Sequence, residues 1–193
     1  GRSDAGSLRR RNFLADADAA LDALLARPGV DPDRVVVYGN SLGGVIGLAL
    51  AHRRDEVRAV VSTAAFSRWQ RVASDHTGPL GRALIRHGLD AEVSAAALGG
   101  RPLLIIHGTA DEIVPVYHAG RIAASARAAG VPVTVASLEG VTHNDLMVTR
   151  EAQREVAAFL HDALVEQGRR AASRTTPPSG ASATTTPAPG RTP

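Results

Sequence analysis

A serine lies between two apolar segments, in the motif GNSLG at residues 39–43. The residues before it, 34–38, are RVVVY, and a β-branched run without alternation favours a strand that is buried on both faces. The segment 41–51 is apolar on nearly every side, which favours a buried helix. A tight turn from strand to helix lifts a serine hydroxyl clear of the sheet, so the pattern indicates that Ser41 is a nucleophile.

The neighbours of Ser41 have expected roles in this nucleophile elbow. We expect a side chain at Gly39 or Gly43 to collide with neighbouring backbone, because the turn is very tight. The N-terminus of the following helix favours the negative charge that develops there during acyl transfer. The backbone N–H of Leu42 is the predicted donor to that oxyanion.

An acid and a base are expected downstream of Ser41, because a serine hydroxyl is a poor nucleophile until a base removes its proton. Where the serine lies on such an elbow, the chain order is serine, acid, histidine. A predicted strand at 102–107 is followed by Asp111, and a predicted strand at 131–137 is followed by His143. All three residues therefore emerge at the same edge of a sheet, and the pattern predicts a catalytic triad.

Other acids and histidines compete for these roles. Glu112 and Asp145 are alternative acids, and Asp111 could instead cap the helix that follows it. Asp145 lies two residues after His143, which is too close for an easy approach to the far nitrogen of the ring. The remaining histidines are assigned to a strand end (His107, read as structural), to helices (His52, His118 and His161) and to a long connection (His76 and His87).

The rest of the chain is predicted to alternate helices and strands. A polar loop at 1–12 precedes an amphipathic helix at 13–27, whose apolar residues recur at steps of three and four. Further along, we expect a strand at 57–64 and helices near 116–129 and 149–167. Such alternation is typical of an α/β fold with a doubly wound, mostly parallel sheet.

A long segment, 67–100, interrupts this alternation and holds a predicted helix at 80–87. An insertion there is expected to act as a cap above the carboxyl ends of the strands, where ligands bind in open α/β sheets. Its arginines either steer an anionic head group or form a solvated face (Arg68, Arg71, Arg82 and Arg86). The folded domain is expected to span 1–168, and the Thr/Pro/Ala-rich segment 169–193 is predicted to be disordered.

Composition and charge exclude several classes of protein. The chain has no cysteine, which excludes disulfides, thiolate metal sites and a cysteine nucleophile. Four of the 22 arginines and none of the 19 acids follow residue 168, so the body is near neutral despite a formal charge of +3. A body without a basic face argues against nucleic-acid binding. No apolar run approaches the roughly 18 residues of a membrane span, and a cytoplasmic location is expected.

Three segments resemble serine hydrolases of the α/β-hydrolase superfamily: 34–44, 102–115 and 140–146. The resemblance runs from Gly1 to about residue 167, and it is strongest to the lysophospholipase, acyl-thioesterase and prolyl-oligopeptidase-like group. The opening residues GRSD are similar to the loop that follows the fourth strand in such enzymes. By this likeness Ser41, Asp111 and His143 form the triad, with Leu42 as an oxyanion donor.

The resemblance implies a hydrolase that cleaves a small-molecule carboxylic ester or thioester through an acyl-enzyme, with no cofactor and no metal. The alternatives are an acyltransferase or a peptidase with the same triad, and a non-catalytic fragment or interaction module. In this fold a loop after the third strand supplies the second oxyanion donor, and that strand would precede Gly1. The chain is therefore expected to be the C-terminal part of the domain, without its N-terminal strands, and inactive by itself.

Overall fold

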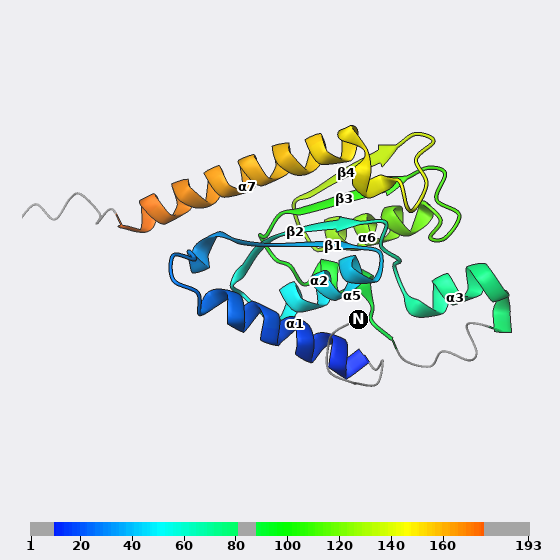
Figure 1. Cartoon of the computed structure of the whole chain (residues 1–193), viewed down its shortest axis with the longest axis horizontal. Helices are drawn as coiled ribbons and strands as arrows, with labels where there is room; N and C mark the ends of the chain where they lie inside the picture. Colours follow the sequence, from blue (N-terminus) through cyan, green and yellow to red (C-terminus); the bar gives the residue numbers. More distant parts are fainter. Residues whose placement is uncertain (1–9, 81–87, 176–193) are drawn as a thin grey trace, which may run out of the picture.

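The computed structural model describes residues 10–80 and 88–175, which form a parallel sheet with helices on both faces (Figure 1). The sheet has the strand order β1-β2-β3-β4, and every neighbouring pair is parallel. The strands are β1 (Val35–Asn40), β2 (Val57–Thr63), β3 (Leu103–Gly108) and β4 (Val133–Leu138). Each overlaps a strand expected from the sequence, so the predicted α/β class is confirmed.

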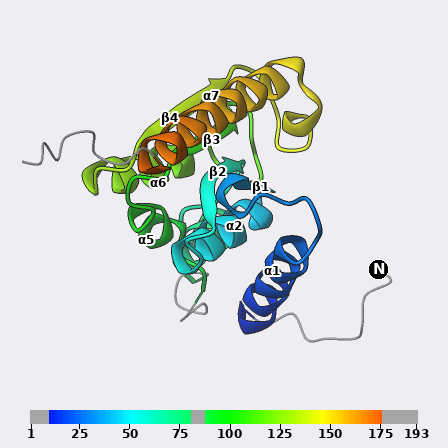
Figure 2. The ribbon, with the colours of Figure 1, turned by 90° about the vertical axis from the view of Figure 1, so that its left-hand side faces the viewer.

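The helices divide between the two faces of the sheet. They are α1 (Arg10–Leu25), α2 (Leu42–Arg53), α3 (Trp69–Thr77), α5 (Ala91–Ala96), α6 (Tyr117–Ala128) and α7 (Arg150–Thr175), with short 3-10 turns η1 (Pro32–Arg34) and η2 (Leu146–Val148). α7 lies along one face, over β3 and β4, whereas α2, α5 and α6 cover the other (Figure 2). α1 packs on the outside of α2, and α3 lies at the end of the molecule where the strands finish (Figure 1).

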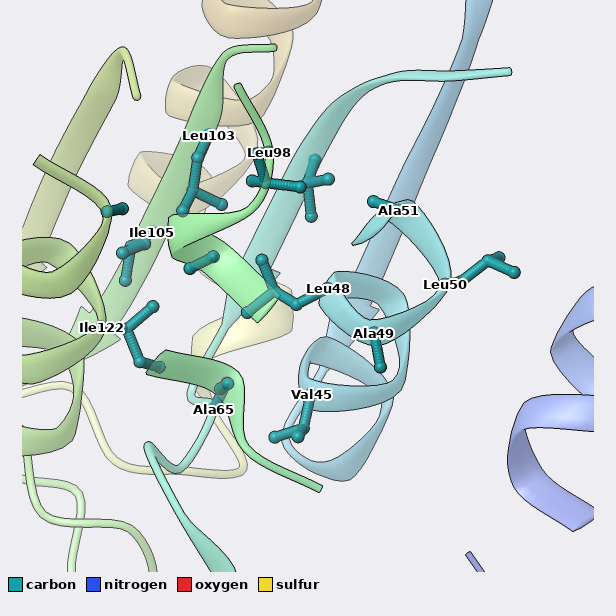
Figure 3. Close-up of a cluster of buried hydrophobic side chains, with 14 of the residues drawn as sticks. Val45, Leu48, Ala49, Leu50, Ala51, Ala65, Leu98, Leu103, Ile105 and Ile122 are labelled. Carbon is teal, nitrogen blue, oxygen red and sulfur yellow. The ribbon is translucent and has the colours of Figure 1, made fainter. Parts of the chain in front are cut away.

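Apolar side chains fill the space on both faces of the sheet. On the α2 face, Leu48 and Ile122 point toward Ile105 of β3, while Leu50 extends from the other side of α2 toward α1 (Figure 3). A second cluster lies under α7 and includes Val61, Leu104, Ile106, Leu138, Leu146, Ala152 and Val156. Burying one large aliphatic side chain contributes about 1.5–3 kcal/mol, so these two layers fix the strand ends that carry the candidate site.

β1 differs from the other strands because it is an edge. It pairs with β2 on one side, and no strand of the described residues pairs with its other side. Val36 and Val37 are half-buried and Tyr38 is 45% exposed, whereas β3 is buried along its whole length. The expectation that β1 is buried on both faces is therefore wrong for this sheet: α2 covers one face of β1, but α7 lies over β3 and β4 and leaves Tyr38 on the other face exposed.

Several element boundaries differ from those expected. α1 begins at Arg10, inside the predicted loop, and α7 continues to Thr175, inside the segment 169–193 that was predicted to be disordered. Both extensions are rich in arginine or alanine, which favour helix. The remainder of that tail, and most of the predicted helix at 80–87, lie outside the described residues. None of the described helices is long and apolar enough to cross a lipid bilayer.

Candidate active site

Ser41 occupies the tight turn that joins β1 to α2. Its backbone has φ 53° and ψ −121°, with a positive φ that residues other than glycine rarely adopt. Its N–H donates to the carbonyl oxygen of Thr63 at 2.8 Å, which ties the turn to the end of β2. Strain of this kind persists only where the surrounding structure holds it, and it clusters at active sites. The turn is thus as strained as a nucleophile elbow requires.

Glycine is needed at two positions of this turn, Gly39 and Gly44, and only the first of them was expected. A Cβ atom at Gly39 would lie 2.2 Å from the backbone carbonyl oxygen of Gly43, so that predicted collision is confirmed. A Cβ atom at Gly43 itself would meet nothing within 4 Å, so the collision expected there is wrong. The second close approach belongs to Gly44, where a Cβ would lie 2.7 Å from Ser62 Oγ and 3.0 Å from Ala65 Cβ.

Asp111 follows β3 by three residues and is held by backbone donors. Its Oδ1 atom accepts hydrogen bonds from the N–H groups of Ile113 at 3.0 Å and Val114 at 2.7 Å. The side chain is 0% exposed. The carboxylate therefore caps the turn that follows β3, and the same two bonds fix its direction so that Oδ2 faces His143.

His143 lies five residues after β4 and contacts Asp111 directly. Its Nδ1 atom lies 2.7 Å from Asp111 Oδ2, and the residue is 8% exposed. Because a carboxylate accepts hydrogen bonds, Nδ1 is assigned the proton and Nε2 is left as the basic nitrogen. This is the tautomer that a general base needs. The structure thus joins the predicted acid to the predicted base.

Ser41 is not bonded to this pair. Within the described part of the chain, its half-buried hydroxyl makes no hydrogen bond to His143, and catalytic contacts of this kind are often loose without substrate. Leu42 is the first residue of α2, so its N–H has no acceptor inside the helix. The roles of nucleophile and oxyanion donor stay predictions.

The alternative acids lie in other surroundings. Asp145 Oδ2 accepts the hydroxyl of Thr142 at 2.6 Å, and the side chain of Glu112 is exposed. His107 is the penultimate residue of β3, and its Nε2 atom lies 3.3 Å from Asp111 Oδ2, so it approaches the site more closely than a purely structural reading implied.

A second serine–histidine–aspartate group lies on α3, α6 and the segment between β2 and α3, and sequence reasoning missed it. His118 of α6 places Nε2 at 2.8 Å from Asp75 Oδ2 of α3, and its Nδ1 lies 3.0 Å from both the backbone nitrogen and the hydroxyl of Ser67. The Tyr117 hydroxyl also donates to Asp75, at 2.9 Å. We call Ser67, Asp75, Tyr117 and His118 the α3 clamp, because they fasten α3 to α6.

Two arginines of the insertion are already paired. Arg68 lies 3.1 Å from both Asp90 and Glu92, and Arg71 lies 3.7 Å from Glu92. Burial would raise the pKa of Glu92, but Arg121, Arg71 and Arg68 outweigh burial, and the pKa is lowered. Neither insertion arginine is thus an unpaired cation that awaits an anionic head group. The other two, at 82 and 86, lie outside the described residues.

Ser41 follows β1, Asp111 follows β3 and His143 follows β4, which is the chain order expected of α/β-hydrolases. The chain is a member of this superfamily. More narrowly, residues 7–167 match the model of the prolyl oligopeptidase family, so the chain belongs to that family.

Known proteins similar to this chain include enzymes of more than one kind. It is 32% identical over 165 residues to alpha/beta hydrolase domain-containing protein 17B of Xenopus laevis, a match that covers 84% of this chain and 54% of that protein. Its fold is similar to acetyl xylan esterase 1 from Thermoanaerobacterium (TM-score 0.62, 18% identity, 84% of this chain and 61% of that one). A puromycin-hydrolyzing peptidase of Mycobacterium tuberculosis is likewise similar (TM-score 0.62, 24% identity, 81% and 25%). The chain spans about half the length of the curated relatives it matches.

Proposed function

We propose that this chain carries the catalytic residues of a serine hydrolase that cleaves a carboxylic ester or thioester through an acyl-enzyme. The observation that carries the proposal is the 2.7 Å contact between His143 Nδ1 and Asp111 Oδ2. It lies past the carboxyl ends of β3 and β4, and Ser41 comes directly after the carboxyl end of β1. Membership of a hydrolase family supports it, as does similarity in fold to an acetyl xylan esterase.

The steps follow from the positions of the polar atoms. Ser41 Oγ attacks the acyl carbon while His143 Nε2 takes its proton, and Asp111 stabilises the imidazolium that results. The developing oxyanion accepts the N–H of Leu42. The bond to the leaving oxygen or sulfur then breaks, and His143 returns the proton to the alcohol or thiol. Water repeats the attack on the acyl-enzyme and releases the acid, so this sequence of steps needs no cofactor and no metal.

Hydrolysis of p-nitrophenyl acetate and of a short acyl thioester by the full-length protein tests the proposal, and this and the later substitutions are made in that protein. Ser41→Ala is the matched control. We expect the variant to lose at least about 10⁴-fold in rate, since the triad acts as a unit. Mass spectrometry of the quenched reaction should place the acyl group on the peptide that contains Ser41. Turnover that is equal in Ser41→Ala, or an acyl group on another residue, would contradict the proposal.

A peptidase is the second candidate, because the family model that matches the chain is that of prolyl oligopeptidases. The same three side chains would then cleave an amide, whose amine is a poorer leaving group than an alcohol or a thiol. A p-nitrophenyl ester and the matched p-nitroanilide separate the two candidates. Cleavage of the ester alone supports the esterase, whereas comparable kcat/KM on the anilide supports the peptidase.

A further inference from the structure

His107 is a buried titratable side chain that the proposed mechanism does not use. Its side chain is 0% exposed. Its Nε2 atom lies 2.7 Å from the carbonyl oxygen of Val114 and 3.3 Å from Asp111 Oδ2. A ring nitrogen that faces two acceptors is assigned the proton, so the neutral ring is the Nε2–H tautomer.

The surroundings of His107 favour this neutral ring. Burial lowers the pKa of His107; the backbone bond to Val114 and the charge of Asp111 oppose this shift in part, and His143 adds to it. A neutral His107 ring donates to Val114 and places no positive charge beside His143, which itself becomes an imidazolium in the proposed mechanism.

Val114 links His107 to the carboxylate of Asp111. Its N–H donates to Asp111 Oδ1 at 2.7 Å, and its carbonyl oxygen accepts from His107 Nε2 at 2.7 Å. Val114 is thus held by hydrogen bonds through both its N–H and its carbonyl oxygen. Because Oδ1 is fixed in this way, rotation of the carboxylate is restricted and Oδ2 stays directed at His143 Nδ1.

Packing alone does not account for an imidazole at this position. Within the described residues Nδ1 of His107 has no hydrogen-bond partner, and a buried acceptor that is left unpaired lowers stability. Ile105 and Leu103, two and four residues earlier on the same side of β3, are aliphatic core residues. An aliphatic side chain at 107 would pack without that cost, so the reason for the ring lies at Nε2.

We propose that His107 is a positioning residue, which orients the Asp111 carboxylate toward His143 through Val114. The proposal rests on the proposed function, in which Asp111 and His143 act as a pair. It requires a donor at the place of Nε2 and requires nothing of the rest of the ring.

Two amide substitutions separate that donor from the ring. In His107→Gln the amide nitrogen reaches the place of Nε2, whereas in His107→Asn the shorter side chain ends near the place of Nδ1. For p-nitrophenyl acetate we expect kcat to fall about 10–100-fold in His107→Asn with KM unchanged, since a small displacement of a catalytic group costs that much. His107→Gln should stay within about threefold of the unsubstituted chain. Equal losses in both variants would overturn the proposal.

NMR tests the same idea without turnover. The proton on His143 Nδ1 is expected to resonate far downfield in the unsubstituted chain and in His107→Gln, and to move upfield or exchange away in His107→Asn. If this pattern holds while Ser41 fails to react, the proposed function is wrong and the positioning stands. If Ser41 reacts and the proton is unchanged in His107→Asn, the positioning alone is wrong.

One measurement needs no variant and therefore does not depend on a variant that folds. The ¹⁵N shifts of His107 in the unsubstituted chain should show a neutral ring protonated at Nε2 at pH 7. A ring protonated at Nδ1 alone, which has no donor at Nε2, would overturn the proposal.

Discussion

The Asp111–His143 pair and the α3 clamp contain the same kinds of side chain but differ in access. Ser67 and His118 of the clamp are 0% exposed, so no substrate carbonyl reaches the Ser67 hydroxyl. Ser41 is half-buried on a strained turn, and His143 is 8% exposed at the carboxyl ends of the strands. The clamp is therefore a contact within the fold, whereas the strand-end pair is a candidate for chemistry.

The two histidine rings also use their nitrogens differently. His143 gives Nδ1–H to Asp111, which leaves Nε2 as the base. His118 bonds Asp75 through Nε2, and its Nδ1 already accepts the N–H of Ser67 at 3.0 Å. A lone pair that is engaged by a backbone N–H is a poor base for a hydroxyl. Distances among a serine, a histidine and an aspartate therefore do not identify a triad until burial and ring orientation are added.

Substituting the aspartates one at a time is expected to give the largest difference in turnover between the Asp111–His143 pair and the α3 clamp. Asp111→Asn should lower kcat on p-nitrophenyl acetate by about 10⁴-fold, because an asparagine favours the wrong tautomer of His143. Asp75→Asn and Asp145→Asn should each stay within about threefold, since neither carboxylate contacts His143. Steady-state kinetics on the three variants, with circular dichroism to check folding, decides the matter. Comparable losses in Asp111→Asn and Asp75→Asn would remove the distinction between the two groups.

Alanine substitutions test the turn that sets Ser41 apart from Ser67. Gly39→Ala should lower the free energy of unfolding by about 3 kcal/mol, because its Cβ would meet backbone. Gly43→Ala should raise it by up to about 1 kcal/mol, because this helical position is open and alanine favours helix. Urea denaturation followed by circular dichroism measures both. The same sign of change in the two variants would show that the turn is built differently.

Loss of one hydroxyl from the α3 clamp should change stability and leave activity alone. Burial, together with the bond to Asp75, raises the pKa of Tyr117 to about 12, so its hydroxyl stays a donor up to high pH. Tyr117→Phe should lower the free energy of unfolding by about 1 kcal/mol, the usual contribution of one hydrogen bond. Urea denaturation and ester hydrolysis are measured on the same preparation. A large loss of turnover without a loss of stability would place the clamp in the active site.

The pH dependence of stability gives the smallest expected effect. Burial lowers the pKa of His118 from 6.5, although Asp75 opposes this shift while His107 and Arg71 add to it. Between that lowered pKa and 6.5 the unfolded chain binds more protons, so the free energy of unfolding decreases as the pH falls through this window. His118→Gln removes one of the buried rings and should flatten the slope between pH 7 and pH 5. An unchanged slope would mean that His118 does not titrate in this way.

The candidate site was largely predictable from sequence because of one topological fact. The strands of a parallel sheet finish at the same edge, so residues just past three strands are expected at that edge without any knowledge of loop shapes. Ser41, Asp111 and His143 each follow a strand whose residues are mostly β-branched or aliphatic. The local sequence pattern was sufficient for these residues because it predicts the strands, and the end of a strand determines where the next residues lie.

Contacts between elements distant in the chain could not be predicted in this way. The α3 clamp joins Asp75 to His118 across 43 residues, and no periodicity links the two. Gly44 is needed because Ser62 of β2 packs closely against it. The spacing of Gly44 and Gly47 on α2 was a usable signal in the sequence that this side of the helix approaches another element closely. The exposure of Tyr38 on β1 depends on where α7 packs on the sheet, which the composition of a strand does not specify.

Labelling with a fluorophosphonate probe tests the central claim most directly, because the probe reacts with an activated serine whatever the substrate. The full-length protein and its Ser41→Ala and Ser67→Ala variants are treated at pH 7.5, digested and analysed by mass spectrometry. We predict one labelled peptide, which contains Ser41, full labelling in Ser67→Ala and none in Ser41→Ala. Label on Ser67, or labelling that persists in Ser41→Ala, would contradict the assignment of the reactive serine to the strand-end site.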